Sequence, residues 1–353
     1  MPSAETKIVI IGFRNASDFS ACLAALAKAP RDPAFSIFIC ENGGAEAYQT
    51  LVSALSGANG PCAGPALPLD PPSALFVKSH RLKLAGSIDV TIGEACENLG
   101  YAGGINACIQ VLPPQPDWSG VWVLNPDTEP KPEALAELVD YAQKYNKGMV
   151  GSRIMFMDNP DIVGSRGLSW NRWRASTIGV DIFAPATPAP DRLDVERRID
   201  GPHGASFYIT RKCLEKIGLM DEAYFLYFED FDWGIRAKKA CGLGYAYDSV
   251  VPHRGGTTIG SASKRRLRSE LAVYLDFRNR LLFVRRQYPG WYPWTVLMAL
   301  ARTSEFLAVG ATKNFRAALA GWSAGVRGET GRPDRLLNLA FGAGQTTQPP
   351  PSP

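Results

Sequence analysis

The chain opens with two short apolar runs and a helical segment between them, and this order constrains the fold more than any other feature. The runs are residues 7–13 and 35–40, both rich in isoleucine. Capping residues at 15–18 precede apolar side chains that recur on one helical face, which predicts a helix between two strands. A strand, a helix and a strand within the first 40 residues form a βαβ unit, so the sequence predicts an α/β fold with a mostly parallel sheet.

Polar residues follow the predicted strands at the points where those strands end. Glu41-Asn42-Gly43 follows the second strand, and a later buried strand at 120–124 ends in Asn125-Pro126-Asp127. Because α/β sheets bind ligands outside the carboxyl ends of their strands, Asp127 is a candidate metal ligand. Many aspartates at strand ends serve only as turn or cap residues, but the position at this edge of the sheet favours the metal role.

A glycine-rich segment with the sequence NLGYAGGIN, residues 98–106, is a second candidate binding element. Its glycines allow the backbone to approach a phosphate or a sugar, and a helix is predicted to begin near Gly103. The spacing is not G-x-G-x-x-G, which argues against a dinucleotide site and hence against an NAD-dependent dehydrogenase. Residues 56–73, rich in glycine and proline, are predicted to form an irregular insertion.

The stretch from 220 to 253 combines aromatic and acidic residues. The aromatic run at 224–228 leads into Glu229 and Asp230, at the start of a helix predicted to extend to about residue 240. Acids in the first turn suit the helix dipole, so both could be purely structural. The aromatic run before these acids favours a role in the chemistry of a site, because aromatic side chains would form a partly dry pocket that tunes the basicity of a carboxylate. A strand follows and ends at His253, one of three histidines and a candidate ligand beside a metal carboxylate.

Composition describes an ordinary globular protein, with 46% hydrophobic and 20% charged residues and a net charge of +4. Residues 264–287 hold eight basic residues and two acids, so the basicity is one local patch and not a general surface for nucleic acid. The seven cysteines form no CxxC pair and are odd in number, which favours a reducing cytoplasm over a disulfide framework or a zinc site. No signal peptide is predicted at the N-terminus.

Two C-terminal segments are predicted to be helical. The first, residues 269–286, carries much of the basic patch, for which contact with an anionic membrane, a solvated face and a contact with acceptor phosphate stay open as alternatives. The second, residues 291–310, is more apolar, but Arg302 and Glu305 interrupt it. A spanning helix is therefore disfavoured, and an interfacial helix and a helix that packs on the core stay open as alternatives.

Taken in order, these motifs resemble the family-2 glycosyltransferases, and most closely the bacterial rhamnosyltransferase-like branch. The resemblance covers residues 5–290 and rests on Glu41-Asn42-Gly43, NLGYAGGIN, LNPDT, the long segment 204–242 and PHRGG. It implies a GT-A fold within residues 1–260, with a Rossmann-like nucleotide-binding half (about 1–128) and an acceptor-binding half (about 129–260). A helical extension (261–330) and a disordered tail (331–353) are expected to follow.

The resemblance also implies roles for individual residues. Asp127 matches the surviving acid of an Asp-x-Asp motif whose first position is Asn125 here, and His253 matches a histidine that completes the site for Mn²⁺ or Mg²⁺. Asp230 matches the catalytic base, with Glu229 beside it. Positions near the nucleoside, the sugar and the diphosphate are matched by Asn42, Asn98, Gly100, Gly103, Gly104, Asn125 and Asp127.

The implied activity is inverting transfer of a sugar from a nucleotide diphosphate donor to a saccharide acceptor. The donor would be dTDP-, UDP- or GDP-linked, with rhamnose from dTDP as the choice that the branch implies. The acceptor would be lipid-linked, in cell-surface polysaccharide synthesis at the cytoplasmic side of the membrane. A nucleotidyltransferase is the closest rival, but Gly12-Phe13-Arg14-Asn15 is not its glycine-rich, basic loop. The other alternative is a non-catalytic sugar- or lipid-binding relative, against which the intact acids argue.

Overall fold

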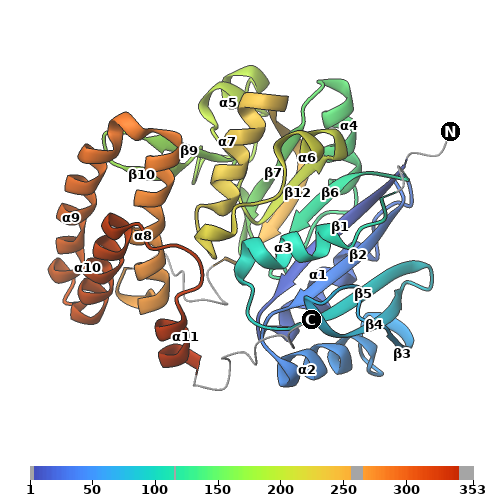
Figure 1. Ribbon diagram of the computed structural model, residues 1–353. Helices are drawn as coiled ribbons and strands as arrows, with labels where there is room; N and C mark the ends of the chain where they lie inside the picture. Colours follow the sequence, from blue (N-terminus) through green and yellow to red (C-terminus); the bar gives the residue numbers. More distant parts are fainter. Residues whose placement is uncertain (1–3, 115–116, 256–264, 342–353) are drawn as a thin grey trace.

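The structure, a computed structural model, describes residues 4–114, 117–255 and 265–341 (Figure 1). A ten-stranded mixed sheet runs through its centre in the order β12-β7-β11-β6-β1-β2-β5-β4-β3, with β8 paired to β7. Four of these strands are mutually parallel and form the middle of the sheet: β1 (Glu5–Gly12), β2 (Phe35–Glu41), β5 (Ile88–Ala95) and β6 (Trp118–Leu124). The predicted α/β class with a largely parallel sheet is therefore confirmed.

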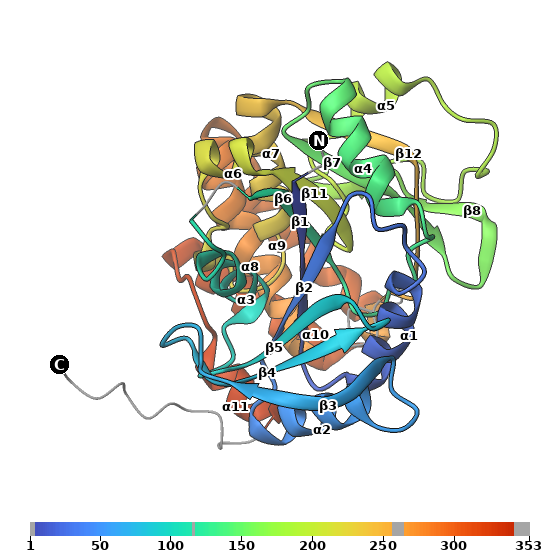
Figure 2. The same cartoon turned by 90° about the vertical axis from the view of Figure 1, so that its right-hand side faces the viewer.

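Helices cover both faces of the sheet, because successive side chains of a strand point to opposite sides. Ile8 and Ile10 of β1 pack against α1 (Ala16–Leu26), α2 (Ala45–Ser56) and α4 (Ala134–Lys144). Val9 and Ile11 pack in the other core, with α3 (Gly100–Gln110), α6 (Arg211–Ile217) and α7 (Glu229–Cys241). Figure 2 shows the two helical layers on either side of the sheet.

The two edges of the sheet depart from the parallel pattern. At one edge β4 (Phe76–Leu84) pairs antiparallel with β5, and β3 (Cys62–Leu69) pairs antiparallel with β4, so the predicted irregular insertion at 56–73 is wrong where β3 lies. Towards the other edge β11 (Ser206–Thr210) lies antiparallel between β6 and β7. The remaining elements of this half are β7 (Met149–Phe156), β8 (Asn159–Ser165), the hairpin of β9 (Leu168–Asn171) and β10 (Ser176–Gly179), α5 (Arg192–Arg198), and β12 (Leu243–His253).

Four helices follow the sheet and pack beside it: α8 (Glu270–Gln287), α9 (Tyr292–Ala308), α10 (Thr312–Arg327) and α11 (Asp334–Phe341). Short 3-10 turns occur at Glu222–Tyr224, Arg265–Leu267 and Pro289–Trp291. Within the described chain, no helix has both the length and the apolar character needed to cross a bilayer. The expected boundary near residue 260 lies outside the described residues.

The structure bears on two expectations about this C-terminal part. Arg278 and Arg280 are buried in α8, where Arg278 donates to backbone carbonyls and Arg280 pairs with Asp276. The basic patch is therefore not a lipid-facing surface at these positions, while Lys264 lies outside the described residues. Part of the expected disordered tail is ordered as α11, because buried Leu337 and the Phe341 ring anchor it to the body of the protein.

Candidate active site

One cleft of about 920 Å³ opens at the carboxyl ends of the central strands. Both halves of the sheet contribute to its walls, together with the loop before α7 and the C-terminal helices. Eight predicted site residues line it: Asn42, Asn98, Gly100, Asn125, Asp127, Glu229, Asp230 and His253. The two others, Gly103 and Gly104, are buried inside α3, where Gly104 gives the space that brings this helix against β1.

Asn42, which directly follows β2, organises the glycine-rich turn that begins α3. Its side-chain amide donates to the carbonyl oxygen of Gly100 (2.9 Å), and its oxygen accepts from the backbone of Leu99 (3.3 Å). Gly100 has φ +72°, and a methyl group there would lie 2.3 Å from the carbonyl oxygen of Phe225. The turn therefore contacts the aromatic loop, residues 224–228, which precedes α7. Helix α3 begins at Gly100, three residues before the predicted start.

Asp127 and His253 meet where two strands end. A bridge between Thr128 and His253 brings the end of β12 against the turn after β6, and His253 Nε2 lies 3.2 Å from Asp127 Oδ1. Burial of Asp127 opposes ionisation, but the hydrogen bond and charge of His253 and the nearby backbone N–H groups together outweigh burial and lower the pKa of this carboxyl. The predicted pairing in space of these two residues is thus present.

The geometry of this pair fits a divalent cation. Two ligands about 2.1 Å from one ion and at right angles to each other lie about 3 Å apart, close to the observed separation. Carboxylate oxygen and imidazole nitrogen suit Mn²⁺ or Mg²⁺. No cluster of three or more potential ligand side chains occurs in the described part of the chain, so an ion held here would need further ligands besides this pair.

His203 lies beside this pair but is not a third ligand. Its ring is 5.5 Å from that of His253, and its Nδ1 accepts a hydrogen bond from the backbone of Ala205 (3.2 Å). Burial lowers the pKa of His203 to about 3, so the ring is neutral with its single proton on Nε2. The lone pair that could bind a metal is therefore already used.

The aromatic loop before α7 is strained and held in place from behind. Phe225, Tyr227 and Phe228 have φ values of 64°, 70° and 77°, a region that costs about 1–3 kcal/mol for each non-glycine residue. The buried Asn279 of α8 donates its side-chain amide to three carbonyl oxygens of this loop, at residues 224, 226 and 227. Such strain persists only when the surrounding structure imposes it, and α8 supplies that constraint.

Glu229 and Asp230 follow this loop and differ in environment. Glu229 is 2% exposed, and its Oε2 has no hydrogen-bond partner among the described residues. Burial and the neighbouring charge of Asp230 raise the pKa of Glu229 well above its usual range, which favours its protonated form. Asp230 lies on the cleft wall, where burial raises its pKa to about 6. At neutral pH the ionised member of the pair is Asp230.

Gly204 leaves the space that the Asp230 carboxylate occupies. A methyl group at Gly204 would lie only 2.1 Å from Asp230 Oδ2. The hydroxyl of Tyr101 lies 2.8 Å from the carbonyl oxygen of Gly204 and 2.9 Å from the side-chain oxygen of Asn125. Tyr101 thus connects the wall that carries Asp230 with the turn that carries Asp127.

The sequence relationships of the chain agree with this arrangement. Residues 89–271, just over half of the chain, match the sequence model of a family described as "Glycosyltransferase like family 2". The chain belongs to glycosyltransferase family 2.

Two named glycosyltransferases are similar to this chain in sequence. The low-salt glycan biosynthesis hexosyltransferase Agl10 of Haloferax volcanii is 28% identical over 255 residues, which cover 68% of this chain and 76% of that protein. The N-acetylglucosaminyl-diphospho-decaprenol L-rhamnosyltransferase of Mycobacterium tuberculosis is 27% identical over 229 residues, which cover 60% of this chain and 73% of that protein. The predicted likeness to the rhamnosyltransferase branch is confirmed.

Solved structures establish the fold of the glycosyltransferase. S. aureus TarS 1–349 in complex with UDP-GlcNAc superposes with a TM-score of 0.51 at 12% identity, over 95% of this chain and 83% of that chain. GalNAc-T7 with UDP, GalNAc and Mn²⁺ gives the same TM-score of 0.51 at 14% identity, over 89% of this chain and 54% of that chain. These are GT-A folds, which confirms the predicted fold class.

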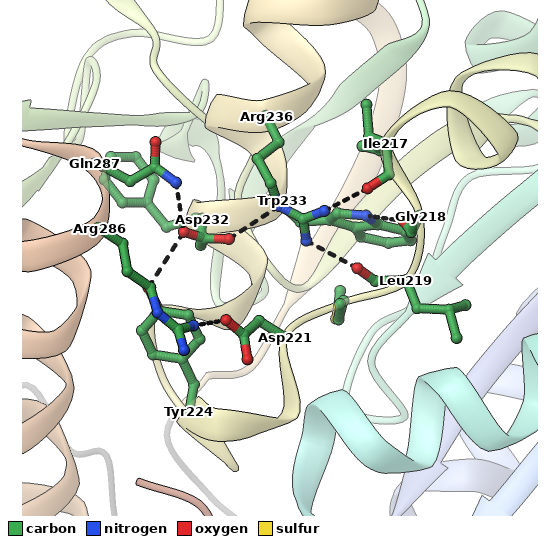
Figure 3. Close-up of polar contacts among 12 residues, drawn as sticks. Ile217, Gly218, Leu219, Asp221, Tyr224, Asp232, Trp233, Arg236, Arg286 and Gln287 are labelled. Carbon is green, nitrogen blue, oxygen red and sulfur yellow. Dashed lines mark hydrogen bonds and ion pairs between the residues drawn. The ribbon is translucent and has the colours of Figure 1, made fainter. Parts of the chain in front are cut away.

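A third acid near the site has a structural role in this glycosyltransferase (Figure 3). Asp232 is 2% exposed and accepts hydrogen bonds from Arg236 (3.0 Å), Gln287 (2.8 Å) and the Tyr224 hydroxyl (3.2 Å). Arg236 in turn donates to the carbonyl oxygens of residues 217 and 219. Because every contact of Asp232 points into the protein, this acid fixes α7 to its neighbours and leaves the cleft to Asp230.

Several residues of the site have no counterpart among the predicted ones. Tyr101 and Gly204 occur inside segments that the sequence singles out, NLGYAGGIN and 204–242, but their contacts depend on the tertiary structure. Asn279 lies 49 residues after Asp230 in the chain, and no local pattern connects the two. Phe341 lines the cleft from α11, within the segment for which disorder is predicted.

Proposed function

We propose that this enzyme carries out metal-dependent, inverting transfer of a sugar from a nucleotide diphosphate donor to a saccharide acceptor. The observation that carries the proposal is the meeting of the Asp127–His253 pair and Asp230 in one cleft. The Asp127–His253 pair could hold the donor diphosphate through Mn²⁺ or Mg²⁺, and Asp230 could activate the acceptor. A nucleotidyltransferase would not need a base of this kind facing an acceptor.

The roles of the residues follow from their positions. A bound Mn²⁺ or Mg²⁺ would stabilise the negative charge that develops on the departing diphosphate. Asp230 receives the proton of the acceptor hydroxyl, which is a weak nucleophile until it is deprotonated. Glu229, neutral and buried, adds no second negative charge beside the base. Attack by the acceptor from the face opposite the nucleotide inverts the anomeric centre.

The relatives support a narrower choice of substrates. The name of the mycobacterial relative specifies a lipid-linked acceptor and L-rhamnose, and that of the Haloferax relative a hexose in glycan synthesis. We therefore propose a lipid-linked saccharide as acceptor and a hexose, with rhamnose from dTDP as the first to test. Such an acceptor would bring the enzyme to the cytoplasmic face of a membrane.

A thermal-shift screen tests the donor assignment. We expect one of the dTDP-, UDP- or GDP-linked sugars to raise the melting temperature when Mn²⁺ is present and to have little effect when EDTA replaces it. At a concentration of 100 Kd, a ligand stabilises the folded state by about 2.7 kcal/mol, which corresponds to several degrees for a chain of this size. No shift with any of these nucleotides would contradict the donor class.

The dependence of transfer on pH tests the base. An aspartate must be ionised to accept a proton, and the raised pKa of Asp230 keeps the folded enzyme protonated at this position up to about pH 6. We expect kcat/KM to be level above this pH and to fall below it, by about tenfold for each pH unit once the pH is well below the pKa. A profile that stays level down to about pH 5 would argue against Asp230 as the base.

A further inference from the structure

Helix α9 leaves one apolar face exposed to solvent. Its buried side consists of Thr295, Ala299, Thr303 and Phe306, which face the other C-terminal helices. Among the exposed residues of α9, all of them described, only Ser304 is polar. The exposed large apolar residues recur at helical spacing and continue just past the helix end: Trp294, Leu297, Leu300, Leu307 and Val309. We call this surface the α9 face, and Figure 1 shows α9 at the outer left edge of the molecule.

The tip of the β9–β10 hairpin extends the α9 face with a further tryptophan. Trp173 is 70% exposed, and its ring contacts those of Trp291 and Trp294 edge-on, with centroids 4.9 Å and 6.3 Å apart. Trp294 Nε1 donates to the carbonyl oxygen of Trp173 (3.0 Å), which fixes the tip against the helix. Tryptophan is enriched at the boundary between lipid and water, because it combines an apolar ring with a polar N–H group.

Exposed cations flank the α9 face at both ends. Arg172 and Arg174 are exposed beside Trp173 at the hairpin tip, and Lys313 and Arg316 are exposed after the other end of the helix. The charged residues within α9, Arg302 and Glu305, form an ion pair with each other. An apolar face with a positive rim is complementary to a surface of anionic lipid headgroups.

Two other occupants of the α9 face fit less well. In a pair of identical copies packed through this face, like charges would meet, because both ends of the face are positive. The chain's own C-terminal residues, 342–353, contain no large apolar side chain that could cover it.

We propose that the α9 face and the hairpin tip lie on an anionic phospholipid surface. The same hairpin lines the cleft through Leu168 and Thr177. Thr177 is four residues from Trp173, so at most about 13 Å separates them along the chain. Docking through this face would therefore bring the cleft close to the lipid surface, where a lipid-linked acceptor is found. The proposal deepens the function proposed above by naming the surface that meets the lipid.

Cosedimentation of the full-length chain with vesicles tests the proposal. We expect binding to vesicles of phosphatidylglycerol and phosphatidylcholine, weaker binding to phosphatidylcholine alone, and a decrease with added salt. Leu297, 63% exposed, is the site for the variant Leu297→Glu, which should weaken binding by about tenfold or more. Arg316→Gln should weaken it by about fivefold, the effect of one cation near the surface.

The matched control is Leu67→Glu, which makes the same change at another exposed leucine, on β3 at the far edge of the sheet (Figure 1). It should bind vesicles as the wild type does. Equal binding by Leu297→Glu and the wild type would overturn the proposal, and so would absence of binding by the wild type. Self-association of the wild type that Leu297→Glu abolishes, without vesicle binding, would assign the face to a second copy instead. The assay needs no sugar transfer, so its outcome is independent of the proposed activity.

Discussion

Asp230→Asn is expected to lower the rate of sugar transfer by about 10²–10⁴-fold while donor binding stays unchanged. The substitution keeps the shape and volume of the side chain but removes its capacity to accept a proton. Asp230 faces the cleft, and Gly204 leaves its carboxylate room there. The Asp127–His253 pair is not altered, so Mn²⁺-dependent nucleotide affinity should persist. Transfer under single-turnover conditions, together with calorimetry of donor binding, separates the two effects.

Glu229→Gln is the matched control for this prediction. Because Glu229 is buried and its raised pKa favours the protonated form, glutamine resembles that form, and the rate should fall much less. If the two acids served only the helix N-terminus, either change would cost about 1 kcal/mol of stability and little rate. An Asp230→Asn enzyme that folds, binds donor and transfers sugar at nearly the wild-type rate would show that Asp230 is not the base.

The middle of the fold could be predicted from sequence because its signals are local. Parallel strands that are buried on both faces, such as β1 and β6, have apolar runs that end sharply in polar residues. These local signals predict that Asn42 and Asp127 lie at one edge of the sheet, and both line the cleft. The start of α3 was harder to predict, because Gly100 begins the helix through its contact with the distant Phe225.

The parts that could not be predicted depend on contacts between distant segments. The strand β3 contains Gly64, Pro65 and Pro68, residues that are disfavoured in a strand and accepted here because β3 is an edge. The arginines of α8 appear as a surface patch in the sequence, but their carbonyl and carboxylate partners come from other segments.

The geometry of the aromatic loop before α7 also depends on contacts between distant segments. The sequence predicts that aromatic residues approach Glu229 and Asp230, but not that three of them adopt positive φ. That conformation is imposed by Asn279, whose amide reaches three carbonyl oxygens of the loop. The helices after residue 265 are therefore part of the support for the active site. The predicted division of the chain near residue 260 does not separate these helices from the cleft that they support.

The second large effect is expected at the metal site. Asp127→Ala should abolish the Mn²⁺-dependent part of nucleotide affinity, because the pair then keeps only an imidazole to hold the ion. His253→Ala should weaken it and leave the carboxylate as the remaining ligand. Loss of an outer-shell partner of a metal already costs about 10–100-fold in affinity, so loss of a direct ligand should cost at least as much. Calorimetric titration of the nucleotide with Mn²⁺ and with EDTA measures this difference.

His80→Ala is the control for removal of a histidine. His80 lies on β4, where its Nδ1 is hydrogen-bonded to the Tyr48 hydroxyl (2.6 Å), and it does not line the cleft. Its loss should leave Mn²⁺-dependent affinity unchanged. His203→Ala should also retain the metal dependence, since the Nδ1 lone pair of His203 already accepts a hydrogen bond from a backbone N–H. Unchanged Mn²⁺-dependent affinity in both Asp127→Ala and His253→Ala would show that these residues do not share a metal, and the 3.2 Å contact between them would then be a structural hydrogen bond.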